Sequence, residues 1–298
     1  MKKIFFIILI LATNVIAQTA GNSGLAFLKL GFGARNIAMS DLGVTTANDV
    51  TALNYNPALI TNLNNTQFSF THSEWIQDVN CDMLGIGFQL FSLPFVIGIN
   101  STNIPDIEVR TNPGDAETTF NVHYIFGSLS TAFNLYKNLD LGLTLKYIYE
   151  SFFQNKAKGF AGDIGLVYTD VIKNLNAGIS LKNIGDMEKL RAERTKLPAD
   201  LRIGASYSKK VDVINSDIIF LTGLQKYLAT DDIHIHFGTE ILYQNLIALR
   251  LGYATGYESK DFSAGIGILW NSLNFDYAFT PFQYSLGSSH TISLMYSF

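Results

Sequence analysis

The chain has 298 residues and a formal net charge of −4, and only 15% of its residues are charged. Soluble proteins usually have about a quarter of charged residues, so an ordinary water-facing surface is not expected. The acidic balance argues against nucleic acid as a partner, because phosphate binding needs a basic surface.

Residues 1–17 have the pattern of a secretory signal peptide. Lys2 and Lys3 give a positive start, and the apolar run that follows them is too short to cross a bilayer as a helix. Val15-Ile16-Ala17 is a small-residue cleavage site, so the mature chain is expected to begin near Gln18. No later stretch is long and apolar enough for a transmembrane helix. An exported chain of this composition is expected in the bacterial outer membrane.

Residues 18–65 lack a two-residue period and are rich in small residues. The stretch "GARNIAMSDLGVTTANDVTALNYNPALI" begins at Gly33 and contains the tripeptide Asn56-Pro57-Ala58. Pro57 restricts Asn56 to extended or turn geometry. Small side chains of this kind can pack closely inside another structure.

From residue 66 to residue 298 the dominant period is two, which predicts β-strands. In "LDLGLTLKYIYE", beginning at Leu139, apolar residues alternate with polar residues and glycine. The alternation predicts about fourteen strands, centred near residues 69, 87, 97, 129, 145, 164, 178, 204, 219, 238, 251, 265, 277 and 294. Apolar faces of about 9 to 11 residues suit tilted strands in a membrane.

The connections between these strands alternate in length. Short turns are predicted after every second strand, and longer polar loops are expected at residues 73–82, 101–121, 151–158, 183–198 and 281–289. This alternation is typical of outer-membrane barrels. An even strand number places both ends of the barrel at the short-turn side, and we expect residues 18–65 to start there and fill the lumen as a plug. The predicted organisation is a signal peptide (1–17), a plug (18–65) and a barrel (66–298).

The end of the chain, "SHTISLMYSF", alternates up to a terminal phenylalanine. A barrel must close because unpaired backbone groups in hydrocarbon are costly. Tyr296 and Phe298 resemble the signal that the outer-membrane barrel assembly machinery reads on the last strand. That machinery and outer-membrane lipid are therefore predicted partners.

The strand pattern directs seven charged residues toward the lumen: Lys146, Glu150, Asp163, Arg202, Glu240, Arg250 and Asp276. Both signs occur, so we expect these residues to pair with one another or with the plug, where Arg35 and Asp49 are candidate partners. The alternative is direct contact with a solute. The segment Asp186 to Arg194 is expected to form a short helix in a loop. The sequence predicts no catalytic residue, no metal ligand and no cofactor.

The plug sequence "FLKLGFGARNIAMSDLGVTTANDVTALNYNPALI" resembles the amino-terminal signature of the PorV/PorQ family of outer-membrane proteins. It is also similar to the hatch of the FadL group of long-chain fatty-acid transporters. The matching residues are Gly33, Ala34, Arg35, Asp49, Asn56, Pro57 and Ala58. Ala38 to Asp41 depart from a more glycine-rich run, and Tyr55 stands where tryptophan is common.

The resemblance implies an all-β fold, a barrel of about fourteen antiparallel strands with a plug, and a non-enzymatic role. The PorV/PorQ branch implies a component of a type IX secretion or surface-attachment pathway, with secretion-system subunits and secreted cargo as partners. The FadL branch implies the alternative, a channel for fatty acids or other hydrophobic molecules with a lipophilic ligand. The first is the leading prediction from sequence.

Overall fold

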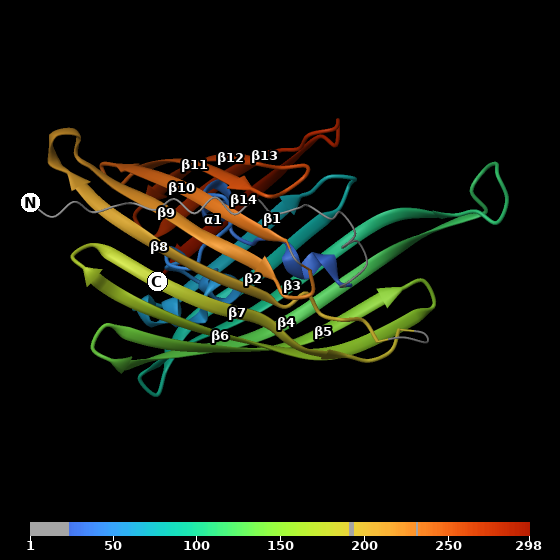
Figure 1. Ribbon diagram of the computed structural model, residues 1–298, viewed down its shortest axis with the longest axis horizontal. Coiled ribbons are helices and arrows are strands. Elements are labelled where there is room, and N and C mark those ends of the chain that lie inside the picture. The colour runs from blue at the N-terminus through green and yellow to red at the C-terminus, as the bar shows by residue number, and fades with distance from the viewer. Residues whose placement is uncertain (1–23, 191–193, 231) are drawn as a thin grey trace, which may run out of the picture.

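The computed structural model describes residues 24–190, 194–230 and 232–298. Within these ranges, fourteen antiparallel strands form a closed barrel in which each strand pairs with its neighbours in sequence and β1 pairs with β14 (Figure 1). The predicted fold class is confirmed, and every predicted strand centre falls inside a strand. The strands are β1 (Gln67–Glu74), β2 (Asn80–Leu90), β3 (Leu93–Val109), β4 (Thr118–Tyr136), β5 (Leu139–Phe152), β6 (Asn155–Ile172), β7 (Leu175–Met187), β8 (Asp200–Val211), β9 (Ser216–Tyr227), β10 (Ile233–Tyr243), β11 (Ile247–Thr255), β12 (Phe262–Trp270), β13 (Leu273–Pro281) and β14 (Ser288–Ser297). The predicted signal peptide lies outside the described residues.

The two faces of the barrel wall differ in polarity. On β5, Leu143 and Leu145 are exposed on the outside, whereas Thr144 and Lys146 are buried inside. Exposed apolar side chains around a buried polar interior are the reverse of a soluble protein and suit strands embedded in hydrocarbon. No helix of the described residues is long and apolar enough to cross a bilayer.

Several predicted loops are partly strand. β3 and β4 have 17 and 19 residues, and their hairpin projects beyond the other connections (Figure 1). The expectation of a loop over residues 101–121 is therefore wrong for all but the tip, and residues 151–158 are likewise mostly strand. Where a hairpin extends past the barrel, both of its faces meet water, so the apolar alternation that marks a membrane strand is absent.

The helix expected from Asp186 to Arg194 is also wrong. β7 continues to Met187, a bridge joins Lys189 to Arg194, and Asp186 forms an ion pair of 2.5 Å with Arg194. A helix would separate residues eight apart by about 12 Å, so these contacts require the chain to turn back on itself. Residues 191–193 lie outside the described ranges.

The segment before β1 lies inside the barrel, and we call it the plug. It contains η1 (Ala26–Lys29), α1 (Ala34–Ala38), α2 (Ala52–Tyr55) and η2 (Pro57–Asn62). α1 contacts β11 to β14, whereas η2 contacts β3 to β6, so the plug bridges opposite walls.

The described part of the plug begins at the side of the long loops, and residues 18–23, where the segment is expected to start, lie outside the described residues. The amide of Gly24 donates to the carbonyl oxygen of Lys196, between β7 and β8, at 3.0 Å. At its other end, Leu63 accepts a hydrogen bond from Gln89, close to the β2–β3 turn. The plug therefore crosses the lumen from the long-loop side to the short-turn side, where β1 begins.

Candidate functional site

The tripeptide Asn56-Pro57-Ala58 fixes the plug to the wall. Asn56 is fully buried, and its Oδ1 accepts a hydrogen bond of 3.1 Å from the amide of Ala58, which caps η2. Its Nδ2 donates to the carbonyl oxygens of Val44 in the plug at 2.9 Å and Leu166 in β6 at 3.1 Å. One amide side chain thus starts a helix and joins two parts of the plug to the barrel.

Glycines in the wall make this contact possible. A Cβ atom added at Gly165 would lie 1.8 Å from Asn56 Oδ1, and one at Gly142 would lie 2.1 Å from the carbonyl carbon of Pro57. Any larger residue at these positions would overlap the plug. The inward-facing glycines of β5 and β6 therefore admit the backbone of the plug.

The other plug residues singled out in the sequence lie around α1. Gly33 has a φ of +92° directly before the helix, and its missing side chain leaves space for Thr51. The amide of Ala34 donates to Ser293 Oγ in β14 at 2.8 Å. Asp49 is buried and accepts hydrogen bonds from the amide and hydroxyl of Thr51 at 2.7 and 2.5 Å. The hydrogen bonds of Asp49 therefore stay within the plug rather than reaching a lumen cation.

Arg35 lies in a chain of alternating charges. Its guanidinium binds Glu240 in β10 through two hydrogen bonds of 2.8 Å. Glu240 also accepts from Arg250 Nε at 2.5 Å, and Arg250 Nη1 donates to Asp276 at 2.6 Å. Arg35 also donates to the carbonyl oxygen of Thr46 at 2.6 Å. Each charge has an opposite neighbour, which offsets much of the cost of burying it.

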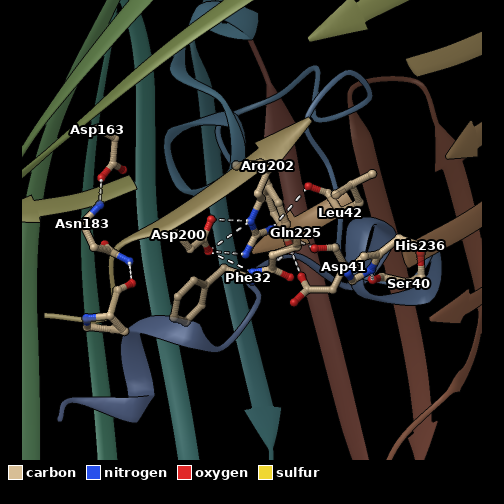
Figure 2. A network of polar contacts seen from close by, with 12 residues as sticks. Phe32, Ser40, Asp41, Leu42, Asp163, Asn183, Asp200, Arg202, Gln225 and His236 are labelled. Carbon is tan, nitrogen blue, oxygen red and sulfur yellow. Dashed lines mark hydrogen bonds and ion pairs between the residues drawn. The ribbon is translucent and has the colours of Figure 1, made fainter. Parts of the chain in front are cut away.

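A second network surrounds Arg202 in β8 (Figure 2). Arg202 binds Asp200 at 3.1 to 3.2 Å and donates to the plug carbonyl oxygen of Asp41 at 2.8 Å. Gln225 in β9 donates to Asp200 at 2.9 Å, and His236 Nδ1 lies 2.6 Å from the carbonyl oxygen of Ser40. The plug backbone is therefore held by side chains from β8 and β10, and Gln225 of β9 supports Asp200 beside Arg202.

Sequence reasoning did not select Asp200 as a site residue. Asp200 and Arg202 are two apart on the same face of a strand, which could have predicted their pairing. Gln225 and Asp41 gave no comparable signal, because their partners come from segments distant in the sequence.

Of the remaining lumen charges, Lys146 and Asp163 are paired, whereas Glu150 is not paired within the described residues. Lys146 Nζ lies 2.7 Å from Asp163 and donates to Asn183 Oδ1 at 2.8 Å. Asn183 has a φ of +56° at a register shift between β6 and β7, and its amide donates to Asp163 at 2.8 Å. Glu150 is buried, and its Oε2 has no hydrogen-bond partner among the described residues. Six of the seven predicted charges therefore lie in ion pairs, and Glu150 does not.

The residues predicted as an assembly signal lie on the outside of the barrel. Tyr296 and Phe298 are exposed, with ring centroids 4.9 Å apart, and the amide of Phe298 donates to the carbonyl oxygen of Thr66 at 2.9 Å. The end of the chain thus closes the seam between β14 and the start of β1. Their role in assembly stays a prediction.

Two cavities lie on opposite sides of α1. The loop-side cavity encloses about 40 Å³ and is lined mainly by apolar groups, including Leu30, Ile37, Trp75 and Phe262. The turn-side cavity has a volume of about 590 Å³, and its lining mixes charged residues such as Arg35 with apolar residues such as Leu242 and Leu269. Because Ile37 and Arg35 belong to the same short helix, α1 is the partition between the two spaces.

Three connections meet over the loop-side cavity. Lys260 Nζ lies 5.5 Å from the ring centroid of Trp75 and 4.7 Å from that of Tyr257, and the ring of Trp75 packs edge-on against Phe282 at 4.9 Å. No carboxylate among the described residues forms an ion pair with Lys260. Burial lowers the pKa of Lys260 and raises the pKa of Tyr257 well above its ordinary value. This roof is held by aromatic and cation–π contacts.

With this geometry in view, comparison with solved structures is informative. The Pseudomonas putida toluene transporter TodX superposes with a TM-score of 0.59 at 14% identity, covering 90% of this chain and 98% of TodX. The CymD monoaromatic hydrocarbon channel gives 0.60 at 14% identity over 90% and 98% of the two chains. A Pseudomonas aeruginosa FadL homologue gives 0.58 at 10% identity over 90% and 99%.

The barrel is FadL-like in fold. At these identities the likeness concerns the fold alone, and no protein-family model and no curated protein sequence matches the chain. The similarity extends over nearly the full length of each of these structures. The fold expected from the sequence resemblance is therefore correct, and membership of the PorV/PorQ family has no support at the level of sequence matches.

Proposed function

We propose that this protein is a non-enzymatic channel for small hydrophobic molecules in a bacterial outer membrane. The observation that carries the proposal is the position of α1 between a mainly apolar cavity under the long loops and a larger cavity of mixed polar and apolar lining on the side of the short turns. The FadL-like fold supports this function over a role in secretion, because the similar structures named above include a toluene transporter and a monoaromatic hydrocarbon channel.

In this proposal the structure is the closed state of the channel. A cavity of about 40 Å³ has room for roughly three water molecules, so a hydrophobic solute requires the roof or α1 to move. α1 is held against Ala278 of β13 by apolar packing and to the wall by a few polar contacts. Besides Arg35, they are the amide of Ala34 with Ser293, and Ser263 Oγ with the carbonyl oxygen of Ala38 and the amide of Ser40. Breaking them would join the two cavities.

The experiment compares uptake of labelled toluene by cells that carry the protein in the outer membrane and cells that lack it. Ala254→Trp places a bulky ring in the loop-side cavity, which Ala254 lines. Ala205→Trp is the matched control, because Ala205 lies on the outer face of β8. We expect faster uptake with the wild type and with Ala205→Trp than with Ala254→Trp. Equal uptake by all four strains would reject the channel.

The second candidate is the PorV/PorQ-like role in a type IX secretion or surface-attachment pathway. It rests on the plug residues Gly33 to Arg35 and Asn56 to Ala58, and on the β3–β4 hairpin that projects beyond the barrel and offers a surface for a partner protein. An affinity pull-down from the native outer membrane tests it. Recovery of secretion-system subunits or secreted cargo would favour this role, whereas co-purifying lipophiles without those proteins would favour the channel. The assembly machinery and outer-membrane lipid are proposed partners under either function.

A further inference from the structure

A side chain of the plug occupies part of the long-loop half of the lumen, beside β4. The ring of Phe27 in η1 stacks on Tyr124 of β4 with centroids 4.6 Å apart and an interplanar angle of 13°, and it lies 6.1 Å from the ring of Phe126. Phe27 is buried in an apolar cluster that also contains Met187 and Leu197. The wall therefore offers an aromatic slot, and Phe27 occupies it.

The segment that carries Phe27 has few polar contacts with the wall, among them Lys29 Nζ at 4.6 Å from the ring centroid of Tyr227. η1 has four residues, and it follows Leu25, whose φ of +54° is a left-handed conformation that side-chain-bearing residues rarely adopt. The amide of Gly24 binds Lys196, and the amide of Phe32 binds the hydroxyl of Tyr55. Between these two points, the hydrogen bonds of Leu28 and Leu30 stay within the segment. Its apolar side chains are thus the main contacts that hold it against the wall.

An unpaired acid lies beside the same slot. Glu150 of β5 is directly opposite Tyr124 in the register of β4 and β5, so both side chains project from neighbouring positions on one face. Glu150 is 6% exposed, and its Oε2 has no hydrogen-bond partner among the described residues. Buried polar atoms are normally paired, so this oxygen is an acceptor that suits a donor from a bound molecule.

We propose that Tyr124, Phe126 and Glu150 form a binding site for a small aromatic compound that carries a hydrogen-bond donor. In the closed state the ring of Phe27 takes the position of the ligand ring. The ligand displaces η1, stacks on Tyr124 and donates to Glu150. The inference rests on the proposed channel function and narrows its substrates from hydrophobic molecules in general to aromatic compounds with a hydroxyl or amine group.

The test measures binding of p-cresol and toluene to the purified full-length protein in detergent. Phe27→Leu removes the tethered ring but keeps an apolar side chain. Phe32→Leu is the matched control, since Phe32 also packs against Phe126, at 6.0 Å, from another part of the plug. Removing an internal competitor raises apparent affinity, so p-cresol is expected to bind Phe27→Leu about tenfold more tightly than the wild type or Phe32→Leu. Equal affinity for Phe27→Leu and Phe32→Leu would overturn the assignment of the slot.

The role of Glu150 is tested in the Phe27→Leu background. Glu150→Leu removes the acceptor, and the ratio of p-cresol to toluene affinity is expected to fall about tenfold. Glu150→Gln keeps an acceptor oxygen and should retain most of the preference. An unchanged ratio in Glu150→Leu would show that the acid does not contact the ligand. Because the same ratio is compared between variants, the different solubilities of the two compounds cancel.

A measurement on the wild type avoids any folding defect of the variants. Saturating p-cresol is expected to speed amide hydrogen exchange in residues 26–29, because it displaces η1, and to leave exchange in η2 unchanged. Binding without faster exchange would contradict displacement of Phe27. The two proposals can fail separately. If the protein binds p-cresol in detergent but does not support uptake by cells, the binding site is supported and only the proposed transport is rejected.

Discussion

Arg35 of the plug and Glu240 of the barrel wall share two hydrogen bonds of 2.8 Å, although they are 205 residues apart in the sequence. Glu240 is also bound by Arg250, so one carboxylate serves a cation on the plug and a cation on the wall. Because the carboxylate is shared, substituting Glu240 on the wall and substituting Arg35 on the plug are expected to change the stability of the protein by different amounts.

Glu240→Gln is expected to destabilise the protein more than Arg35→Met. In Arg35→Met, Glu240 keeps Arg250 as its partner. In Glu240→Gln, Arg35 loses its carboxylate partner while Arg250 keeps only Asp276, and leaving a buried charge uncompensated costs about 3–5 kcal/mol. Thermal unfolding, followed by the change in electrophoretic mobility of the folded barrel, gives the order of the two variants. Arg110→Met, in the exposed tip of the β3–β4 hairpin, is the control. The opposite order would show that Arg250 does not support Glu240.

Gly165→Ala is expected to displace the plug. The added methyl group would meet Asn56 Oδ1 at 1.8 Å, and overpacking of this kind typically costs about 1–3 kcal/mol. Gly127→Ala is the matched control in the same barrel, because an added Cβ there has no neighbour within 4 Å. Limited proteolysis of the plug measures the effect. Equal protection in both variants would contradict the close packing of Asn56 against β6.

Asn56→Asp is expected to be more harmful than Asn56→Ala. The side-chain Nδ2 faces the carbonyl oxygens of Val44 and Leu166, and an aspartate oxygen in its place would repel both. Alanine leaves those acceptors unpaired, which costs about 1–3 kcal/mol, whereas a buried charge costs more. The unfolding temperature at pH 8 compares the two variants. At a pH low enough to protonate the aspartate, the difference between them should shrink.

Lys260 is expected to make the stability of the folded protein depend on pH, in a direction that follows from its lowered pKa. Its pKa in the folded protein is lowered by burial, so the folded state holds this proton less tightly than the unfolded chain. Stability therefore increases as pH rises from the lowered pKa toward the ordinary value of about 10.4. The unfolding temperature of the wild type is expected to rise relative to Lys260→Met between pH 8 and pH 9.5. Subtracting Lys260→Met removes the titration of the other groups, and the upper limit stays below the ordinary pKa of tyrosine. A constant difference would show that Lys260 does not titrate in this range.

The barrel could be predicted from sequence because apolar and polar residues alternate within each strand, whatever the strand pairs with. Alternation in "LDLGLTLKYIYE" fixes which side chains face out, and closure fixes the pairing of β1 with β14. Lys146, Arg202 and Glu240 follow from the same alternation, since a period of two assigns a face to every residue of a strand.

The course of the plug could not be predicted in this way. Gly24 lies beside Lys196, and Asn56 lies beside Leu166, and neither contact has a periodic signal in the sequence. The partners of Arg35 and Arg202 depend on where the plug crosses the lumen, which only the packed structure defines. The extension of β3 and β4 beyond the barrel could not be predicted for a different reason. Both faces of this hairpin meet water, so neither face has a preference for apolar residues.

The close fit between the plug and the glycines of β5 and β6 has an electrical consequence. Where the wall contributes no side chains, the space beside it is filled by the plug backbone alone. If the plug leaves, Gly142 and Gly165 have no side chains to take its place, and the width of the lumen there is set by the barrel backbone. Ion conductance of a single barrel would then change in one large step when the plug is displaced, rather than by gradual widening.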